Sequence, residues 1–329
     1  MNLPLAAVDQ DAPPGVEAIH AAAARLRGRV HHTPLLGSAS IDRDLGARVL
    51  FKCENFQRVG AFKARGATNA VFSLDEAEAK RGVATHSSGN HGAALALAAA
   101  ERGIPCWVVV PGNATGVKRA AIVRYGARIV DCAPTMTARE AGLASVVAET
   151  GAAVVHPFDD YRVIAGQGTA ALEMLDAEPD IDLLLCPVGG GGLISGCAIV
   201  AASHTAPVRV VGCEPAGADD ARQSFLCGKR ITLDTPETMA DGLRASLGRR
   251  NFGIIRKLVD DIVTVEEVEI VSAMRLIWER MKILIEPSAA VPVAALIKGA
   301  VDIRGRTVGV ILSGGNMDLN RLPWQSSGQ

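Results

Sequence analysis

The chain has 329 residues and a formal net charge of −1, so nothing marks a surface for nucleic acid. This length suggests about two domains, or one large domain with an insertion. Hydrophobic residues make up 49% and aromatic residues only 4%, a composition typical of buried parallel strands packed by helices.

Strand and helix patterns alternate along the chain. Between 82 and 158 they form several βα units, enough for a four-stranded parallel sheet, and the same rhythm continues afterwards. We therefore expect an α/β fold with two parallel-sheet domains, a small one (82–158) inserted in a large one (1–81 and 159–329). The predicted strands are 48–53, 82–85, 106–110, 127–130, 153–155, 183–186, 208–213 and 308–312, and the predicted helices are 15–29, 63–74, 93–102, 118–125, 137–149, 168–176, 193–203, 252–258, 265–281 and 288–299.

Lys63 lies in the run Gly60 to Ala67, GAFKARGA, after a predicted strand and turn and at the start of a predicted helix. Small neighbours can hold a lysine immobile and partly desolvated, which lowers the pKa of its amine and makes it a nucleophile. Taken alone, the run favours an ordinary solvated lysine in a first helical turn, because perturbed lysines are rare.

The run Ser87-Ser88-Gly89-Asn90-His91 joins a predicted strand to a helix. Backbone amides and hydroxyls at a helix N-terminus can hold a carboxylate. The alternative is simple helix capping by Ser88 or Asn90, and His91 alone would more often be a structural histidine.

Four glycines, Gly189, Gly190, Gly191 and Gly192, connect the strand from Leu183 directly to the helix that starts at Leu193. Converging amides at such a helix start form an anion site that side chains would block; the alternative is a flexible connection. Neither register gives the dinucleotide pattern GxGxxG. The run from Gly166 to Ala171 fits the looser GxGxxA, but no clear strand precedes it, and we interpret it as a helix start.

Two further loops follow strands. Ser313 begins the run Ser313 to Asn316, where a serine could bond a ring nitrogen or simply form a tight turn. Glu214 and Asp220, with one backbone carbonyl, could supply oxygen ligands to Mg²⁺ or Ca²⁺. The alternative, favoured by composition, is that Asp219 or Asp220 caps a helix at 221–226.

The cysteines, the N-terminus and the length of the apolar runs argue against a disulfide-bonded, a secreted and a membrane-spanning protein. The seven cysteines are odd in number, form no CxxC pair and mostly lie in apolar runs, which predicts reduced thiols in a cytoplasmic protein. The N-terminus has no basic segment before an apolar one, so we expect a short disordered tail rather than a signal peptide. No apolar run reaches membrane-spanning length.

Together these runs resemble the fold-type II pyridoxal phosphate enzymes of the serine/threonine dehydratase–serine racemase group, including threo-3-hydroxyaspartate dehydratase, with a tryptophan synthase β-like fold. The resemblance extends from Thr33 to Leu319. The matching stretches are 51–57, 60–67, 87–91, 163–169, 189–193, 237–242, 285–287 and 312–316.

The resemblance implies a role for each candidate residue. Lys63 would form the Schiff base with pyridoxal phosphate and move the Cα proton; the amides from Gly189 to Leu193 would cradle the phosphate. A neutral Ser313 at the ring nitrogen, rather than a carboxylate, would favour β-elimination over transamination. The remaining implied contacts are Phe62 and Glu286 beside the ring, Asn90 at the ring hydroxyl, the substrate carboxylate at Ser87, Ser88, Asn90 and His91, and a divalent cation (Mg²⁺, Ca²⁺ or Mn²⁺) at Glu214, Asp220 and the carbonyl of Ala218.

The chain also departs from the racemase pattern. Ala61 stands where many members have Ser or Thr, Ala245 replaces a pocket serine, and Phe158 resembles the dehydratase branch. Arg139 falls where racemases carry an arginine near bound dicarboxylates, although it could equally be a solvated helix charge paired with Glu140.

The prediction is a homodimeric ammonia-lyase that converts serine, threonine or 3-hydroxyaspartate to a keto acid and ammonia. The first alternative is an amino-acid racemase with eliminase side activity, in which Ser88 is the acid opposite Lys63. A remote alternative is a nucleotide- or NAD-binding Rossmann protein.

Overall fold

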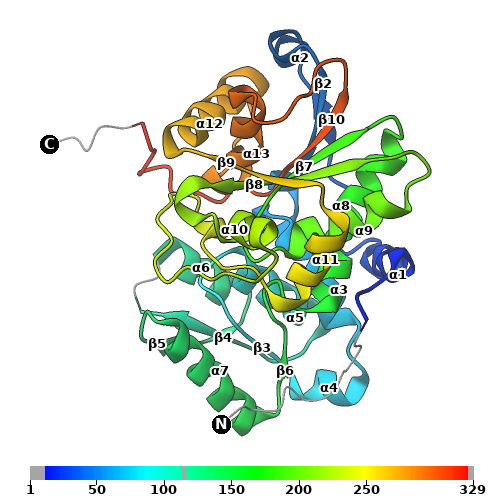
Figure 1. The fold of residues 1–329 in the computed structure, drawn as a ribbon. Coiled ribbons are helices and arrows are strands. Elements are labelled where there is room, and N and C mark those ends of the chain that lie inside the picture. The colour runs from blue at the N-terminus through cyan, green and yellow to red at the C-terminus, as the bar shows by residue number, and fades with distance from the viewer. Residues whose placement is uncertain (1–11, 113–115, 325–329) are drawn as a thin grey trace, which may run out of the picture.

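Two β-sheets organise the chain in a computed structural model that describes residues 12–112 and 116–324 (Figure 1). The large sheet has the order β1-β2-β10-β7-β8-β9 and the small sheet the order β5-β4-β3-β6. Every strand pair is parallel except β1 with β2. The strands are β1 (Leu35–Gly37), β2 (Arg48–Cys53), β3 (Val83–His86), β4 (Cys106–Pro111), β5 (Arg128–Cys132), β6 (Ala153–Val154), β7 (Leu183–Pro187), β8 (Arg209–Pro215), β9 (Asp261–Val265) and β10 (Thr307–Leu312).

The small sheet lies between β2 and β7 in sequence, which confirms the predicted α/β fold with an inserted second sheet. The boundaries at 81 and 158 stay a prediction, and the predicted N-terminal tail lies largely outside the described residues. The helices are α1 (Val16–Leu26), α2 (Ala39–Leu45), α3 (Lys63–Phe72), α4 (Glu76–Arg81), α5 (Asn90–Arg102), α6 (Gly116–Arg124), α7 (Met136–Thr150), α8 (Tyr161–Ala177), α9 (Gly192–Ser203), α10 (Asp220–Cys227), α11 (Arg249–Leu258), α12 (Glu267–Met281) and α13 (Pro287–Lys298), with short 3-10 turns η1 (Glu54–Phe56), η2 (Arg58–Gly60), η3 (Ala216–Ala218) and η4 (Asp241–Leu243).

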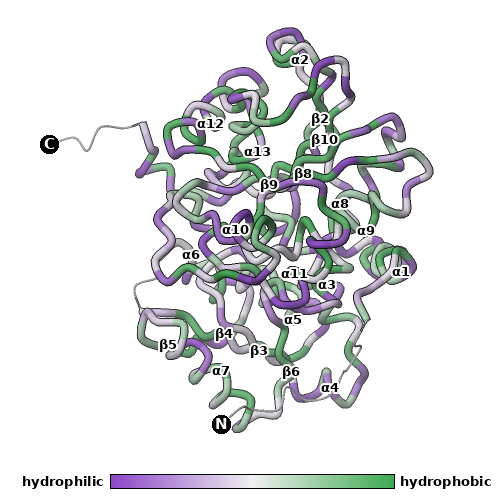
Figure 2. The backbone as a smooth tube through the Cα atoms, viewed as in Figure 1, coloured by the Kyte–Doolittle hydropathy of each residue, from purple (hydrophilic) through white to green (hydrophobic). Residues whose placement is uncertain are grey.

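Both faces of the large sheet are covered. Alternate strand residues face opposite sides: Phe51 and Leu185 pack in a core with α12 and α13, whereas Leu50 and Leu184 pack with α1, α8 and α9. In Figure 2 the central strands are largely hydrophobic, as two-sided burial requires. In the small sheet, α5 and α6 cover one face and α7 the other.

Helix α3 packs against α5 of the small sheet and also against α8 of the large one. Its first residue is Lys63. The position of Lys63 therefore depends on the packing of α3 against both α5 and α8.

Several sequence expectations were wrong in detail. The predicted helix at 265–281 is α12 (Glu267–Met281), but the strand β9 (Asp261–Val265) just before it was missed. Gly166 does not start a helix: α8 begins at Tyr161, where the Asp160 side chain accepts from the amide of Arg162 (2.8 Å). The pattern also missed β1, α2 and α4. No helix among the described residues is long and apolar enough to cross a membrane.

Candidate active site

The loops that carry the predicted site residues follow the ends of parallel strands. Ser87 follows β3, the glycine loop that begins at Gly189 follows β7, and Ser313 follows β10. Lys63 follows β2 after η1 and η2. This is the edge at which open α/β sheets bind ligands.

Lys63 lies between the end of β10 and the segment that returns from the small sheet. The amide of Phe62 donates to the carbonyl of Ser313 (3.0 Å), and the Lys63 ammonium donates to the carbonyl of Pro157 (2.8 Å). The Lys63 Nζ atom also lies 5.0 Å from the centre of the Phe62 ring. The structure therefore brings Lys63, Phe62 and Ser313 together, as the sequence predicts.

Burial lowers the pKa of Lys63 from 10.5 to about 8. Loss of hydration disfavours the ammonium form, and no carboxylate pairs with it among the described residues. Near neutral pH roughly a tenth of the amine is then uncharged, against less than about a thousandth for an ordinary lysine. A neutral, immobile amine can attack a carbonyl carbon and can take up a proton.

The Asn90 side chain is fixed by two partners from distant segments. Its Nδ2 atom donates to Glu286 Oε1 (3.0 Å), and its Oδ1 atom accepts from Asn316 Nδ2 (3.0 Å). The amide of Asn316 in turn donates to Glu286 Oε2 (3.0 Å). Asn90 and Glu286 therefore form one hydrogen-bonded group that links α5 to the segment before α13, beside the loop that begins at Ser313.

The glycine loop presents free amides. Among the described residues, no backbone or side-chain group accepts a hydrogen bond from the amides of residues 189–193. They stand at the N-terminus of α9, where the helix dipole favours an anion. This arrangement fits a phosphate group.

Packing within the protein also requires these glycines. A Cβ atom at Gly190 would lie 2.2 Å from the Phe158 ring, and one at Gly191, where φ is +89°, would lie 2.6 Å from Leu247. Asn251 connects the glycine loop to the segment before α8, because its Nδ2 atom donates to the carbonyl of Gly190 (2.8 Å) and to that of Phe158 (3.0 Å). The flexible connection considered from the sequence is excluded by this packing.

The serines before α5 have different surroundings. Ser87 Oγ accepts from the amides of Gly89 (3.3 Å) and Gly92 (3.2 Å), so it caps the helix. The residue at the N-cap position is Gly89 and neither Ser88 nor Asn90 caps the helix, which corrects the capping alternative. Ser88 is half-buried and has no hydrogen-bond partner among the described residues.

His91 is fully buried beside Lys63. Its Nε2 atom lies 3.1 Å from the carbonyl of Val155, so Nε2 carries the proton and Nδ1 is an acceptor without a partner. Burial, and secondly the Lys63 charge, hold the pKa of His91 well below its usual value. His91 is therefore a neutral acceptor rather than a cation for a carboxylate.

Arg139 lies near His86, which neighbours His156; the sequence patterns single out neither histidine. Burial, the nearby His156 and then Arg139 lower the pKa of His86 to about 4, and the ring centres of His86 and His156 are 5.7 Å apart. The Nε atom of Arg139 is buried without a partner, and Arg139 forms no ion pair with Glu140 or any other described acid. The ion pair with Glu140 considered from the sequence is therefore not formed, and a role of Arg139 in dicarboxylate binding stays a prediction.

Glu214 and Asp220 are buried carboxylates that form no ion pair with a described residue, although the charge of Arg230 acts on Asp220. Burial, and secondly Asp220, raise the pKa of Glu214 well above its usual value, and burial raises that of Asp220 to about 6. Glu214 accepts from the amides of Ala221 and Arg222, and Asp220 accepts from the amide of Leu247. With the buried Ala218 between them, this uncompensated pair fits a divalent cation, although no cluster of three acidic, His or Cys ligands occurs among the described residues.

Comparisons with known proteins agree with this geometry. Residues 26–314 match the family model described as pyridoxal-phosphate dependent enzyme. The chain is 47% identical to a beta-hydroxyaspartate dehydratase of Paracoccus denitrificans over 94% of this chain and 99% of that protein, and 47% identical to a serine racemase of Arabidopsis thaliana over 92% of each. The structure of maize serine racemase superposes with a TM-score of 0.92 at 43% identity, over 94% of this chain and 95% of the other.

Proposed function

The chain belongs to the pyridoxal-phosphate-dependent enzymes, and we propose that it is an ammonia-lyase that eliminates the β-hydroxyl of 3-hydroxyaspartate, serine or threonine. The observation that carries this proposal is the partly buried Lys63 amine, with its lowered pKa, on the same sheet edge as the free amides of residues 189–193. The cofactor supplies an electron-withdrawing ring that acidifies the Cα–H bond of a bound amino acid.

In this proposal each residue has one task. Lys63 holds the cofactor and moves the Cα proton, the amides from Gly189 to Leu193 bind its phosphate, and Asn90 and Ser313 orient its ring. Ser87, Ser88 and the amides at the start of α5 bind the substrate carboxylate. The decisive assay incubates the holoenzyme with the L and D forms of each hydroxy-amino acid and measures keto acid, ammonia and the opposite enantiomer.

Arg139 favours 3-hydroxyaspartate among the three substrates. Its half-buried guanidinium forms no ion pair with a described residue and lies near enough to His86 to lower the pKa of that histidine, so it is available to a second substrate carboxylate. We expect Arg139→Ala to lower kcat/KM for 3-hydroxyaspartate by about 10- to 100-fold and to leave that for L-serine within about threefold. Arg124→Ala, at an exposed position of α6, is the control; an unchanged ratio between the two substrates in Arg139→Ala would refute the assignment.

A racemase is the second candidate, because Ser88 has no hydrogen-bond partner and could protonate the second face of the substrate. We expect Ser88→Ala to lose at least about 90% of any racemisation and to keep elimination. Ser87→Ala should instead destabilise the start of α5 by about 1 kcal/mol and reduce both activities together. Equal losses of both activities in Ser88→Ala would assign Ser88 to carboxylate binding alone.

Three further features belong to the same proposal. A divalent cation, Mg²⁺, Ca²⁺ or Mn²⁺, binds Glu214, Asp220 and the Ala218 carbonyl. The protein works as a homodimer in the cytoplasm. A nucleotide-binding Rossmann site is disfavoured, because the GxGxxA run lies inside α8 rather than between a strand and a helix.

A further inference from the structure

Helix α8 packs against two helices that carry the ends of the proposed cofactor site. It contacts α3, whose first residue is Lys63, and α9, whose N-terminus carries the glycine loop. The run Gly166-Gln167-Gly168, which has no role in the proposed chemistry, lies where these contacts are made.

The two glycines of this run face opposite neighbours. They are two residues apart, about 200° around the helix. A Cβ atom at Gly166 would lie 2.7 Å from Gly66 Cα of α3, and one at Gly168 would lie 2.9 Å from the carbonyl oxygen of Gly196 of α9. Both contacts are backbone to backbone, so neither neighbour can yield without moving its whole helix.

A hydrogen bond fixes α3 at the same crossing. Gln167 Oε1 accepts from the amide of Gly66 (3.1 Å), which stands in the first turn after Lys63. Asn69 Nδ2 donates to the carbonyl of Arg162 (2.7 Å), one turn further along α3. These bonds fix the position of α3 along α8.

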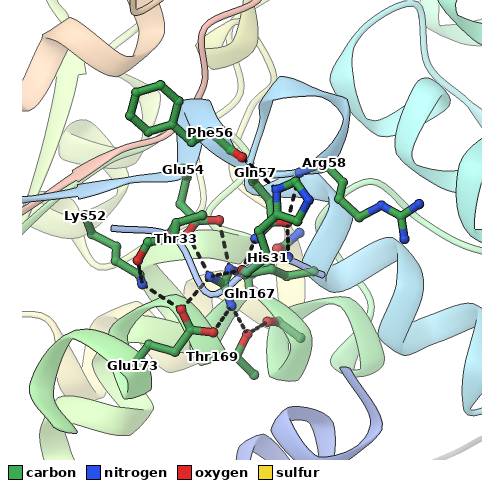
Figure 3. Close-up of polar contacts among 12 residues, drawn as sticks. His31, Thr33, Lys52, Glu54, Phe56, Gln57, Arg58, Gln167, Thr169 and Glu173 are labelled. Atoms are coloured by element: carbon green, nitrogen blue, oxygen red, sulfur yellow. Dashed lines mark hydrogen bonds and ion pairs between the residues drawn. The ribbon is translucent and has the colours of Figure 1, made fainter. Parts of the chain in front are cut away.

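A cluster of buried ion pairs connects α3 to β2, η1 and α8 (Figure 3). Arg65 leaves α3 about 200° around the helix from Lys63, is fully buried, and bonds Glu54 (2.8 Å) and Glu173 of α8 (2.6 and 2.7 Å). Lys52 of β2 completes the cluster through Glu173 (2.6 Å), so two cations meet two carboxylates. Such a buried balanced cluster is costly to break, which makes it a rigid anchor.

We propose that α8 is a spacer that sets the distance between Lys63 and the amides of residues 189–193, with the Gly166-Gln167-Gly168 run as its positioning segment. This inference rests on the proposed function, in which one cofactor is held at both points. A ligand held at two points gains affinity when the points are correctly spaced, because the second attachment is intramolecular. A change in spacing should therefore weaken a two-point ligand and spare one-point ligands.

The test uses three probes on the full-length chain freed of cofactor: pyridoxal phosphate, pyridoxal without phosphate, and inorganic phosphate. In Gly166→Ala and in Gly168→Ala we expect the dissociation constant of pyridoxal phosphate to rise at least about tenfold. Those of pyridoxal and inorganic phosphate should stay within about twofold of the wild-type values. Gly142→Ala is the control, since its Cβ atom would meet only the Val109 and Cys132 side chains, 3.0 to 4.0 Å away, in the small-sheet domain.

Two results would overturn the proposal that α8 is a spacer. One is unchanged affinity for pyridoxal phosphate; the other is an equal loss for all three probes, which would indicate general loosening. If neither alanine variant folds, Gln167→Leu is tested instead, and the same selective loss of pyridoxal phosphate affinity is expected. Gln167→Glu should keep the wild-type affinity, because it retains the acceptor for the Gly66 amide. A wild-type chain that fails to link pyridoxal phosphate at Lys63 would refute the proposed function instead, before any variant is compared.

Discussion

Replacement of Lys63 by alanine should abolish turnover, with a fall of at least about 10³-fold in kcat for every hydroxy-amino acid. The same amine is proposed to hold the cofactor and to move the Cα proton, so both tasks fail together. The wild-type protein should absorb in the visible range, and borohydride should fix the cofactor to the peptide that contains Lys63. Lys63→Ala should bind cofactor only reversibly and show no modified peptide.

The control is Lys229→Ala, which removes an exposed lysine from the turn after α10. It should keep the visible band and the wild-type kcat. A colourless wild-type protein, or turnover by Lys63→Ala near the wild-type rate, would refute the assignment of Lys63.

The lowered pKa of Lys63 predicts how the reaction with aldehydes depends on pH. Only the neutral amine reacts, so the rate of covalent pyridoxal attachment to the cofactor-free chain should rise about tenfold per pH unit and level off near pH 8. An ordinary lysine would level off only above about pH 10. Because burial disfavours the ammonium form in the folded chain, the free energy of unfolding should also rise from about pH 8 toward pH 10.5.

The sequence predicted the sheet edge well because it depends on local patterns. Buried runs of β-branched and aliphatic residues mark β7 and β10, and the loops after them carry glycine and serine. The edge strand β9 was missed because polar residues such as Asp261 and Thr264 interrupt its apolar pattern. Gly166 misled the prediction, since glycine usually breaks helices, whereas here close packing of α3 against α8 requires it.

Long-range contacts account for the site features that the sequence did not give. The acceptor for Lys63 is the carbonyl of Pro157, 94 residues away, and the motif around Lys63 cannot indicate it. The lowered pKa of His86 follows from its burial, and then from the neighbouring His156 and Arg139. Both depend on contacts between segments far apart in the sequence, which periodicity along the chain does not specify.

The carboxylate pair of Glu214 and Asp220 should make the protein strongly stabilised by divalent cations. Without a cation, burial raises the pKa of both carboxylates, and the neighbouring Asp220 raises that of Glu214 further. At a Mg²⁺ concentration about 100 times the dissociation constant, the free energy of unfolding should increase by about 2.7 kcal/mol. Cation binding needs ionised carboxylates, so this gain should appear as the pH rises through about 6.

Glu214→Gln removes one of the two charges and should abolish the Mg²⁺-dependent rise in melting temperature. The cation-free variant itself should be no less stable than the cation-free wild type above pH 6, because the repulsion with Asp220 is also gone. Glu237→Gln is the matched control: its backbone bonds Gly217 in the same loop, but its side chain is exposed, so it should keep the full response to Mg²⁺. An equal response to Mg²⁺ in Glu214→Gln and in the wild type would place the cation elsewhere. The buried pair of Glu214 and Asp220 would then lower the free energy of unfolding without being stabilised by a cation.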